Sequence, residues 1–157
     1  MKPNRKSLLA CLAVPLGAGA LSALLTRDGM ELFQSLEKPP LTPPGWLFPP
    51  VWTVLYLMMG LASYLVLRAG CPRSMIRRAL AVYGLQLFFN FVWTLLFFNL
   101  GAYLLSFFWL AVLWLLILAN FLLFYRISRS AGWLLLPYLL WVLFAGYLNL
   151  GIYLLNR

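Results

Sequence analysis

The chain consists of long apolar runs separated by short polar or basic segments. The runs cover residues 7–25, 46–67, 79–98, 103–125 and 133–155, and none contains Asp, Glu, Lys or Arg. An α-helix needs about 20 apolar residues to cross the roughly 30 Å hydrocarbon core of a bilayer. The pattern therefore predicts an all-α integral membrane bundle of five transmembrane helices, in a single domain covering residues 1–157.

The connection between the first two runs, residues 26–49, is the longest and the richest in proline. Six prolines fall between positions 39 and 50. Proline removes a backbone donor and disfavours a helix interior, but it suits the first helical turn. We therefore expect a stiff, proline-rich lid loop, with the second transmembrane helix beginning near Pro49 or Pro50. A rigid connection with no further role is the alternative interpretation.

Composition agrees with a membrane protein and narrows its chemistry. The chain is 64% hydrophobic and 10% charged, whereas a soluble domain is about a quarter charged. Histidine is absent, and Cys11 and Cys71 have neither metal-ligand nor disulfide spacing. We expect no metal site, no cofactor and no catalytic acid, base or nucleophile. The lack of ionisable groups in the apolar runs also argues against an ion-coupled transporter.

The basic residues lie in the tail and connections, which argues against a nucleic-acid partner and for a membrane topology signal. The N-terminal tail carries three positive residues, and the connections at 68–78 and 126–132 carry four and two. The 26–49 connection holds all three acidic residues. The positive-inside rule predicts a cytoplasmic N-terminus, with the lid loop and the C-terminus outside. The expected location is a bacterial cell membrane.

Aromatic and amide side chains recur at helical spacing in three of the runs. Residues three, four or seven apart share one face of a helix, and rings with a few hydrogen-bonding groups suit a flat, mostly apolar ligand. Alternatively, the amides only join neighbouring helices and the rings anchor helix ends; Asn120 and Trp109 are assigned to that role. The candidates are Trp52 and Tyr56 in the second run, Gln86, Asn90 and Trp93 in the third, and Tyr138, Trp141, Ala145 and Asn149 in the fifth.

The first run carries small residues that let two helices approach closely in a membrane. Ala13, Gly17 and Ala20 recur at intervals of three and four residues, with Gly17 in the centre. We expect a homodimer with these residues at its interface.

Three ordered motifs resemble those of the TspO/MBR family, the tryptophan-rich sensory proteins related to the mitochondrial translocator protein, or peripheral benzodiazepine receptor. The first is Lys38-Pro39-x-x-x-Pro43-Pro44-x-Trp46-x-Phe48-x-x-x-Trp52-x-x-Leu55-Tyr56-x-x-Met59-Gly60. The second is Asn90-x-x-Trp93-x-x-x-Phe97-Phe98, and the third is Pro137-Tyr138-Leu139-x-Trp141-x-x-x-Ala145-x-x-Leu148-Asn149. The chain departs from the family pattern at Leu32-Phe33, where the family usually has Trp-Tyr, at Leu41, where it usually has tryptophan, and at Asn99, where it usually has glycine.

The resemblance implies a five-helix bundle whose first loop caps a pocket, and frequent dimerisation. It implies binding of porphyrins, sterols and synthetic benzodiazepine-site ligands, with porphyrin as a ligand and not a cofactor. The implied pocket positions are Trp46, Trp52, Gln86, Asn90, Trp141 and Ala145. A weak sterol pattern of the family matches Leu150, Tyr153 and Arg157.

These observations favour a membrane receptor or carrier that binds tetrapyrroles or sterols under the 26–49 loop, among membrane lipids. Two alternatives stay open. One is an enzyme that degrades porphyrins with light or oxygen, using aromatic side chains in place of acid–base groups. The other is a structural or partner-binding membrane protein in which the aromatic faces are only packed.

Overall fold

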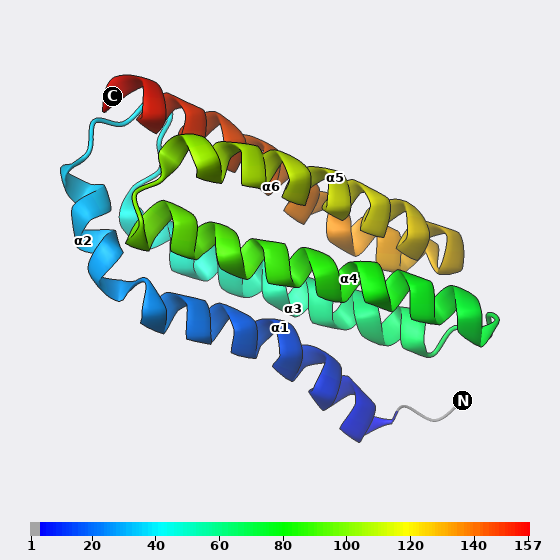
Figure 1. Ribbon diagram of the computed structural model, residues 1–157. Coiled ribbons are helices and arrows are strands. Elements are labelled where there is room, and N and C mark those ends of the chain that lie inside the picture. Colours follow the sequence, from blue (N-terminus) through cyan, green and yellow to red (C-terminus); the bar gives the residue numbers. More distant parts are fainter. Residues whose placement is uncertain (1–3) are drawn as a thin grey trace.

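The computed structural model describes residues 4–157 as a helical bundle, with no strand in that part of the chain (Figure 1). Lys2, counted above in the N-terminal charge, lies outside the described residues. The elements are α1 (Arg5–Leu25), α2 (Arg27–Ser35), the 3-10 turn η1 (Gly45–Leu47), α3 (Phe48–Leu67), α4 (Arg73–Thr94), the π-helical turn η2 (Leu95–Asn99), α5 (Tyr103–Ile127) and α6 (Arg129–Leu155).

Five helices are long and apolar enough to cross a membrane, which confirms the predicted number of spans. The N- and C-terminal ends lie at opposite ends of the bundle, as an odd number of spans requires (Figure 1). The third span begins at Arg73 instead of residue 79, and the fifth at Arg129 instead of 133. Hydropathy marks the membrane core only, and these helices extend past it into their basic first turns.

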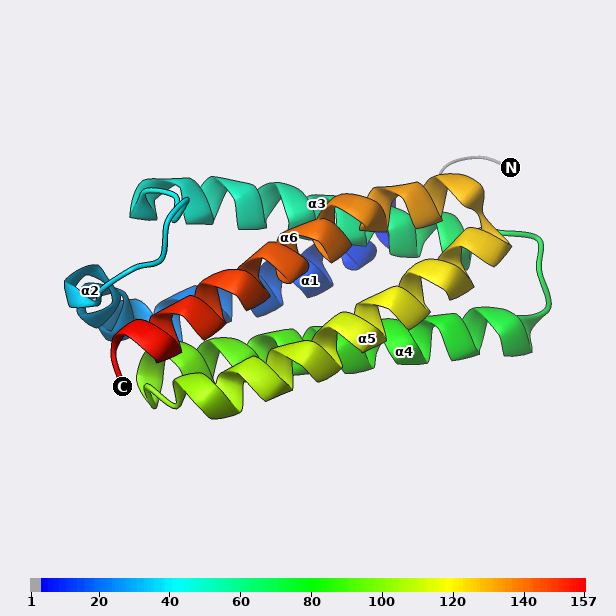
Figure 2. The same cartoon turned by 90° about the horizontal axis from the view of Figure 1, so that it is seen from above.

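The 26–49 connection is not an irregular loop throughout. The prediction is wrong between Arg27 and Ser35, where α2 forms a short helix across the end of the bundle (Figures 1 and 2). Its apolar residues Met30 and Phe33 are three apart and face the bundle, while Glu31 is exposed. The second transmembrane helix starts at Phe48 with Pro49 and Pro50 in its first turn, where a missing N–H costs little.

The proline-rich segment between α2 and η1 lies against the C-terminal turns of α6. The Asn156 amide brackets the backbone of Glu37, accepting from its N–H at 3.0 Å and donating to its carbonyl at 2.8 Å. The Tyr147 hydroxyl donates to the Pro40 carbonyl at 2.7 Å. The Pro39 ring packs on Gly151, where a side-chain carbon would come within 2.6 Å of it. The segment is therefore fixed to α6.

Helix α1 packs closely on α3 where Gly60 of α3 lies against the turn of α1 that contains Pro15. Pro15 has no N–H to donate to the Cys11 carbonyl four residues earlier. Gly60 of α3 approaches this carbonyl so closely that a methyl group on its Cα would lie 2.8 Å from the oxygen. The same methyl group would lie 2.9 Å from the Leu12 Cα, so any larger residue at position 60 would push α1 away from α3.

Candidate functional site

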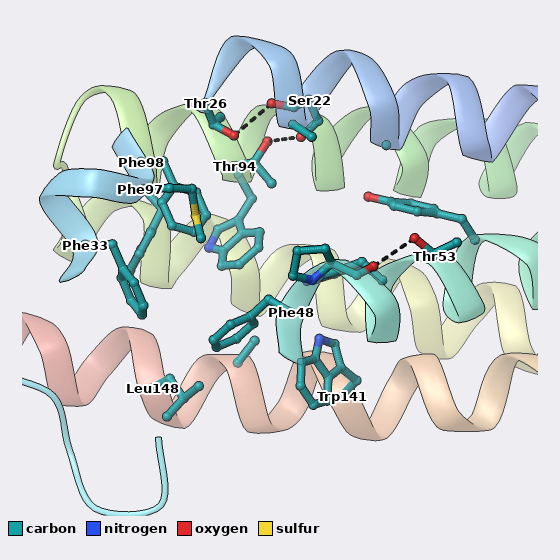
Figure 3. Close-up of a pocket in the computed structure, with 18 of the residues that line it drawn as sticks. Ser22, Thr26, Phe33, Phe48, Thr53, Thr94, Phe97, Phe98, Trp141 and Leu148 are labelled. Atoms are coloured by element: carbon teal, nitrogen blue, oxygen red, sulfur yellow. Dashed lines mark hydrogen bonds between the residues drawn. The ribbon is translucent and has the colours of Figure 1, made fainter. Parts of the chain in front are cut away.

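A cavity of about 510 Å³ lies inside the α2 end of the bundle (Figure 3). Its wall is mostly apolar and aromatic, and α2 with the first turn of α3 covers its end. Residues 36–47 contribute nothing to the lining. The lining residues are Leu16, Gly19, Ala20, Ser22, Ala23, Thr26, Met30, Phe33, Phe48, Pro49, Trp52, Thr53, Tyr56, Trp93, Thr94, Phe97, Phe98, Trp141, Ala145, Leu148, Asn149 and Ile152.

Trp52 is the centre of the aromatic wall. Its ring centroid lies 5.6 Å from Tyr56, one helical turn later in α3. Across the bundle it lies 6.3 Å from Trp93 of α4 and 6.2 Å from Tyr138 of α6. Contacts on three helices leave the Trp52 ring little freedom, so it presents a preformed flat surface to the cavity.

The π-helical turn η2 supplies further rings. The Leu100 N–H bonds the Leu95 carbonyl five residues earlier at 3.1 Å, a widened turn that often occurs at functional sites. Phe97 and Phe98 both line the cavity from this turn, and both contact Phe33 of α2, with centroids 6.1 and 5.8 Å away. Phe33 thus joins the covering helix to the wall below it.

One corner of the cavity is polar. The hydroxyls of Ser22 on α1 and Thr94 on α4 lie 2.8 Å apart (Figure 3). Thr94 donates its hydrogen to the Phe91 carbonyl at 2.6 Å, so Ser22 is the donor in the pair. Thr26 donates to the Ser22 carbonyl at 2.8 Å. The corner therefore has hydroxyl lone pairs, which suit a ligand with an N–H or O–H group.

Behind the aromatic wall, a buried hydrogen-bond network joins α3, α4 and α6. The Tyr56 hydroxyl donates to Asn90 Oδ1 at 2.9 Å, and Asn90 Nδ2 donates to the Tyr138 hydroxyl at 3.0 Å. Tyr138 in turn donates to Gln86 Oε1 at 2.7 Å, and the Gln86 amide lies 4.0 Å from Met59 Sδ. Among these residues only Tyr56 lines the cavity. The network therefore supports the cavity wall from behind and does not itself face the cavity.

A second polar cluster fixes Trp93. Its indole N–H donates to Asn149 Oδ1 at 3.1 Å. The Ser106 hydroxyl lies 3.0 Å from the same oxygen and 2.9 Å from the Tyr103 carbonyl, and its single hydrogen is shared between these two acceptors. Asn149 Nδ2 donates to the Tyr103 carbonyl at 2.8 Å. Asn149 thereby ties α4, α5 and α6 together at the level of the cavity.

The candidates from the sequence fall into three groups: residues that line the cavity, residues in the buried network behind it, and residues outside both. Trp52, Tyr56, Trp93, Trp141, Ala145 and Asn149 line the cavity, whereas Gln86, Asn90 and Tyr138 lie in the buried network. Trp46 is 73% exposed and outside the lining. Leu150 and Tyr153 are half-buried on α6, Arg157 is exposed, and none of the three lines the cavity. Ala13 and Gly17 are exposed on α1, but Ala20 lines the cavity.

The structure also adds residues that the sequence did not single out. The polar corner of Ser22, Thr26 and Thr94 had only the weak signal of hydroxyls within apolar runs. Met30 and Phe33 had the three-residue spacing of a short amphipathic helix. Their neighbour Gly29 packs directly on the Phe98 backbone, an approach that sequence spacing does not reveal.

The cavity opens sideways between α1 and α3. Ala20 and Ala23 on α1, and Pro49 and Thr53 on α3, line it and are also exposed. No carboxylate, amine, guanidinium or thiol is among its described lining residues, and residues 4–157 hold no group of three or more metal-ligating side chains. The site is therefore built to enclose an apolar molecule and to meet a few polar atoms at one corner.

Comparison with known proteins identifies the family of this chain over nearly its whole length. A sequence profile of the TspO/MBR family matches residues 11–155. The tryptophan-rich protein TspO of Chlorobaculum tepidum is 37% identical over 151 residues, or 96% of both chains. That of Archaeoglobus fulgidus is 36% identical over 154 residues, or 98% of this chain and 99% of the relative. The translocator protein of Bos taurus is 35% identical over 142 residues, or 87% of this chain and 82% of the relative. The resemblance is confirmed, and the chain belongs to the TspO/MBR family.

Proposed function

We propose that this membrane protein is a receptor or carrier for flat, largely apolar ligands, with porphyrins and sterols as the ligand classes. The cavity of about 510 Å³ walled by aromatic rings carries the proposal, because its size falls within the usual range for small-molecule sites, about 300–1,000 Å³. The preformed surface of Trp52 provides stacking area, and the Ser22–Thr94 corner provides acceptors for a polar edge. The opening between α1 and α3 faces the apolar surroundings in which such ligands dissolve.

A titration of the purified protein with protoporphyrin tests the proposal. Tryptophan fluorescence should be quenched with a saturable dependence that reaches one ligand per chain, because three tryptophans line the cavity. A free tryptophan derivative in the same detergent is the control for non-specific quenching. Linear quenching equal to that of the control would exclude a porphyrin site.

The orientation in the membrane is part of the proposal. The basic segment 68–78, which is the α3–α4 loop with the first turns of α4, is placed in the cytoplasm and α2 outside, as its charge indicates. In a background with Cys11→Ser and Cys71→Ser, an impermeant maleimide on intact cells should label Ser35→Cys and not Ser74→Cys. Labelling of Ser74→Cys alone would show the reverse orientation.

A homodimer through α1 is likewise proposed. Ala13 and Gly17 are exposed, and no atom lies within 4 Å of the place a Gly17 side chain would take. This face therefore remains free for a second copy, and small residues favour close helix contact. Gly17→Leu should shift the protein toward monomer in mild detergent, as measured by light scattering, with the helical circular dichroism unchanged. A wild-type protein that stays monomeric at all concentrations would contradict the dimer.

A further inference from the structure

Residues 39–47, which join α2 to α3, expose two large apolar side chains at one end of the bundle. Leu41 is 83% exposed and Trp46 is 73% exposed. The segment contains no charged residue, and none of its residues lines the cavity. Exposed apolar surface of this kind indicates an interaction site. Its partner follows from where the segment lies and from what its backbone offers.

The backbone keeps Leu41 exposed at a conformational cost. Leu41 has a φ of 68° and is the only non-glycine residue among residues 4–157 with a positive φ, a region that is disfavoured for side chains other than glycine. Contacts on both sides fix this conformation. The Tyr147 hydroxyl donates to the Pro40 carbonyl at 2.7 Å, and the Thr42 hydroxyl donates to the Pro39 carbonyl at 2.7 Å. Strain that is fixed in this way points to a role for the exposed side chain.

The contacts of the segment with α6 show its depth in the bundle. Pro40 is bonded to Tyr147, and Asn149, two residues later on α6, donates to the Tyr103 carbonyl at 2.8 Å. Two residues of an α-helix span about 3 Å, so the segment lies nearly level with Tyr103, where α5 and its apolar run begin. Figure 2 shows the segment folded back from α2 along the bundle. It therefore lies at the membrane interface, whereas α2, with its charged residues, lies across the end of the bundle.

The backbone of the segment is suited to that depth, where polar groups without hydrogen bonds are costly. Four of its nine residues, Pro39, Pro40, Pro43 and Pro44, have no N–H. The Leu47 N–H donates to the Pro44 carbonyl at 3.0 Å, and the carbonyls of Pro39 and Pro40 accept the two hydroxyl bonds described above. Few backbone groups are left for water or lipid oxygens to satisfy.

We propose that residues 39–47 are a membrane-binding segment in addition to the five spans, with Leu41 and Trp46 inserted among the lipids at this end of the bundle. Tryptophan suits the interface because its ring is apolar and its N–H can meet a lipid ester or phosphate oxygen. Leucine at the same depth contacts the upper part of the acyl chains. Because the segment joins α2 to α3, its insertion also holds the cover of the cavity at the bilayer surface. The inference rests neither on the proposed ligand nor on the proposed orientation, since both leaflets have such an interface.

Electron paramagnetic resonance in lipid nanodiscs tests this inference. In a background with Cys11→Ser and Cys71→Ser, a nitroxide is attached at Leu41→Cys, at Trp46→Cys or, as the aqueous control, at Ser35→Cys on α2. Oxygen is enriched in lipid and nickel EDDA in water. The ratio of oxygen to nickel accessibility should therefore be several-fold higher at positions 41 and 46 than at position 35.

A charged substitution tests the insertion from the opposite direction. With the nitroxide at Trp46→Cys, Leu41→Asp should lower the accessibility ratio several-fold, because a carboxylate is costly to insert among lipids; Leu41→Ala is the control and should lower it less. Helical circular dichroism should be the same in all variants. Ratios at positions 41 and 46 equal to that at position 35 would place the segment in water and overturn the proposal. Low accessibility to both reagents would overturn it as well, because a second copy or another protein would then cover the segment.

Discussion

Replacing Trp52 by alanine is expected to weaken protoporphyrin binding by about 5- to 150-fold, or about 1–3 kcal/mol. Trp52 lines the cavity and is positioned by rings on three helices. Its removal takes away the largest flat contact surface and leaves Tyr56 and Trp93 without the ring that packs between them. The fluorescence titration, repeated with the variant, measures the loss.

A pair of variants shows whether such a loss is specific to the cavity. Trp109→Phe should bind porphyrin like the wild type, because Trp109 is outside the lining, stacked 4.3 Å from Phe89 and bonded to its carbonyl at 2.8 Å. Ala145→Phe should prevent binding by filling the cavity while the circular dichroism stays helical. If Trp109→Phe weakens binding as much as Trp52→Ala does, the ligand site lies elsewhere.

Replacing Asn90 by leucine is expected to lower the free energy of unfolding by about 1–3 kcal/mol. Asn90 is 2% exposed and makes two hydrogen bonds between helices, to Tyr56 and Tyr138. Such bonds in membrane proteins contribute about 0.6 and at most about 1.7 kcal/mol each, and the substitution leaves the Tyr56 hydroxyl without its acceptor. Unfolding in mixed detergent with SDS measures the change.

Asn120 is a matched control for this prediction. It is as deeply buried as Asn90, but its Oδ1 has no partner among the described residues and its Nδ2 reaches the Ala79 carbonyl only at 3.5 Å. Asn120→Leu should therefore cost less than half as much as Asn90→Leu. Equal losses would mean that burial, and not the Tyr56–Asn90–Tyr138 network, determines the stability.

The pattern of apolar runs was sufficient to predict the five spans, because the bilayer sets both their length and their composition. It did not predict α2, because the charged residues and Gly29 of this segment are typical of a loop. The inward-facing apolar residues of α2, Met30 and Phe33, are covered only through their contact with the cavity wall. Nor did the pattern mark the helix starts at Arg73 and Arg129, since basic first turns lie outside the apolar core.

Helical periodicity placed Trp93, Trp141, Ala145 and Asn149 on inward faces, and all four line the cavity. Periodicity does not distinguish an inward-facing residue that lines the cavity from one that is hydrogen-bonded in the network behind the cavity wall. Asn90 is only one turn before Trp93, yet its amide is fully engaged by two tyrosines. That difference depends on the register between α3, α4 and α6, which the spacing within one helix does not contain.

The most direct test of the porphyrin site is an NMR titration of the wild-type protein that follows its indole N–H signals. The ring current of bound protoporphyrin shifts nearby protons strongly and distant ones hardly at all. Trp52, Trp93 and Trp141 line the cavity, while Trp109 and Trp114 donate to the Phe89 and Leu139 carbonyls outside it. The proposed site predicts large, saturable shifts for the first three signals and almost none for the other two. Shifts confined to Trp109, Trp114 or the exposed Trp46 would contradict it.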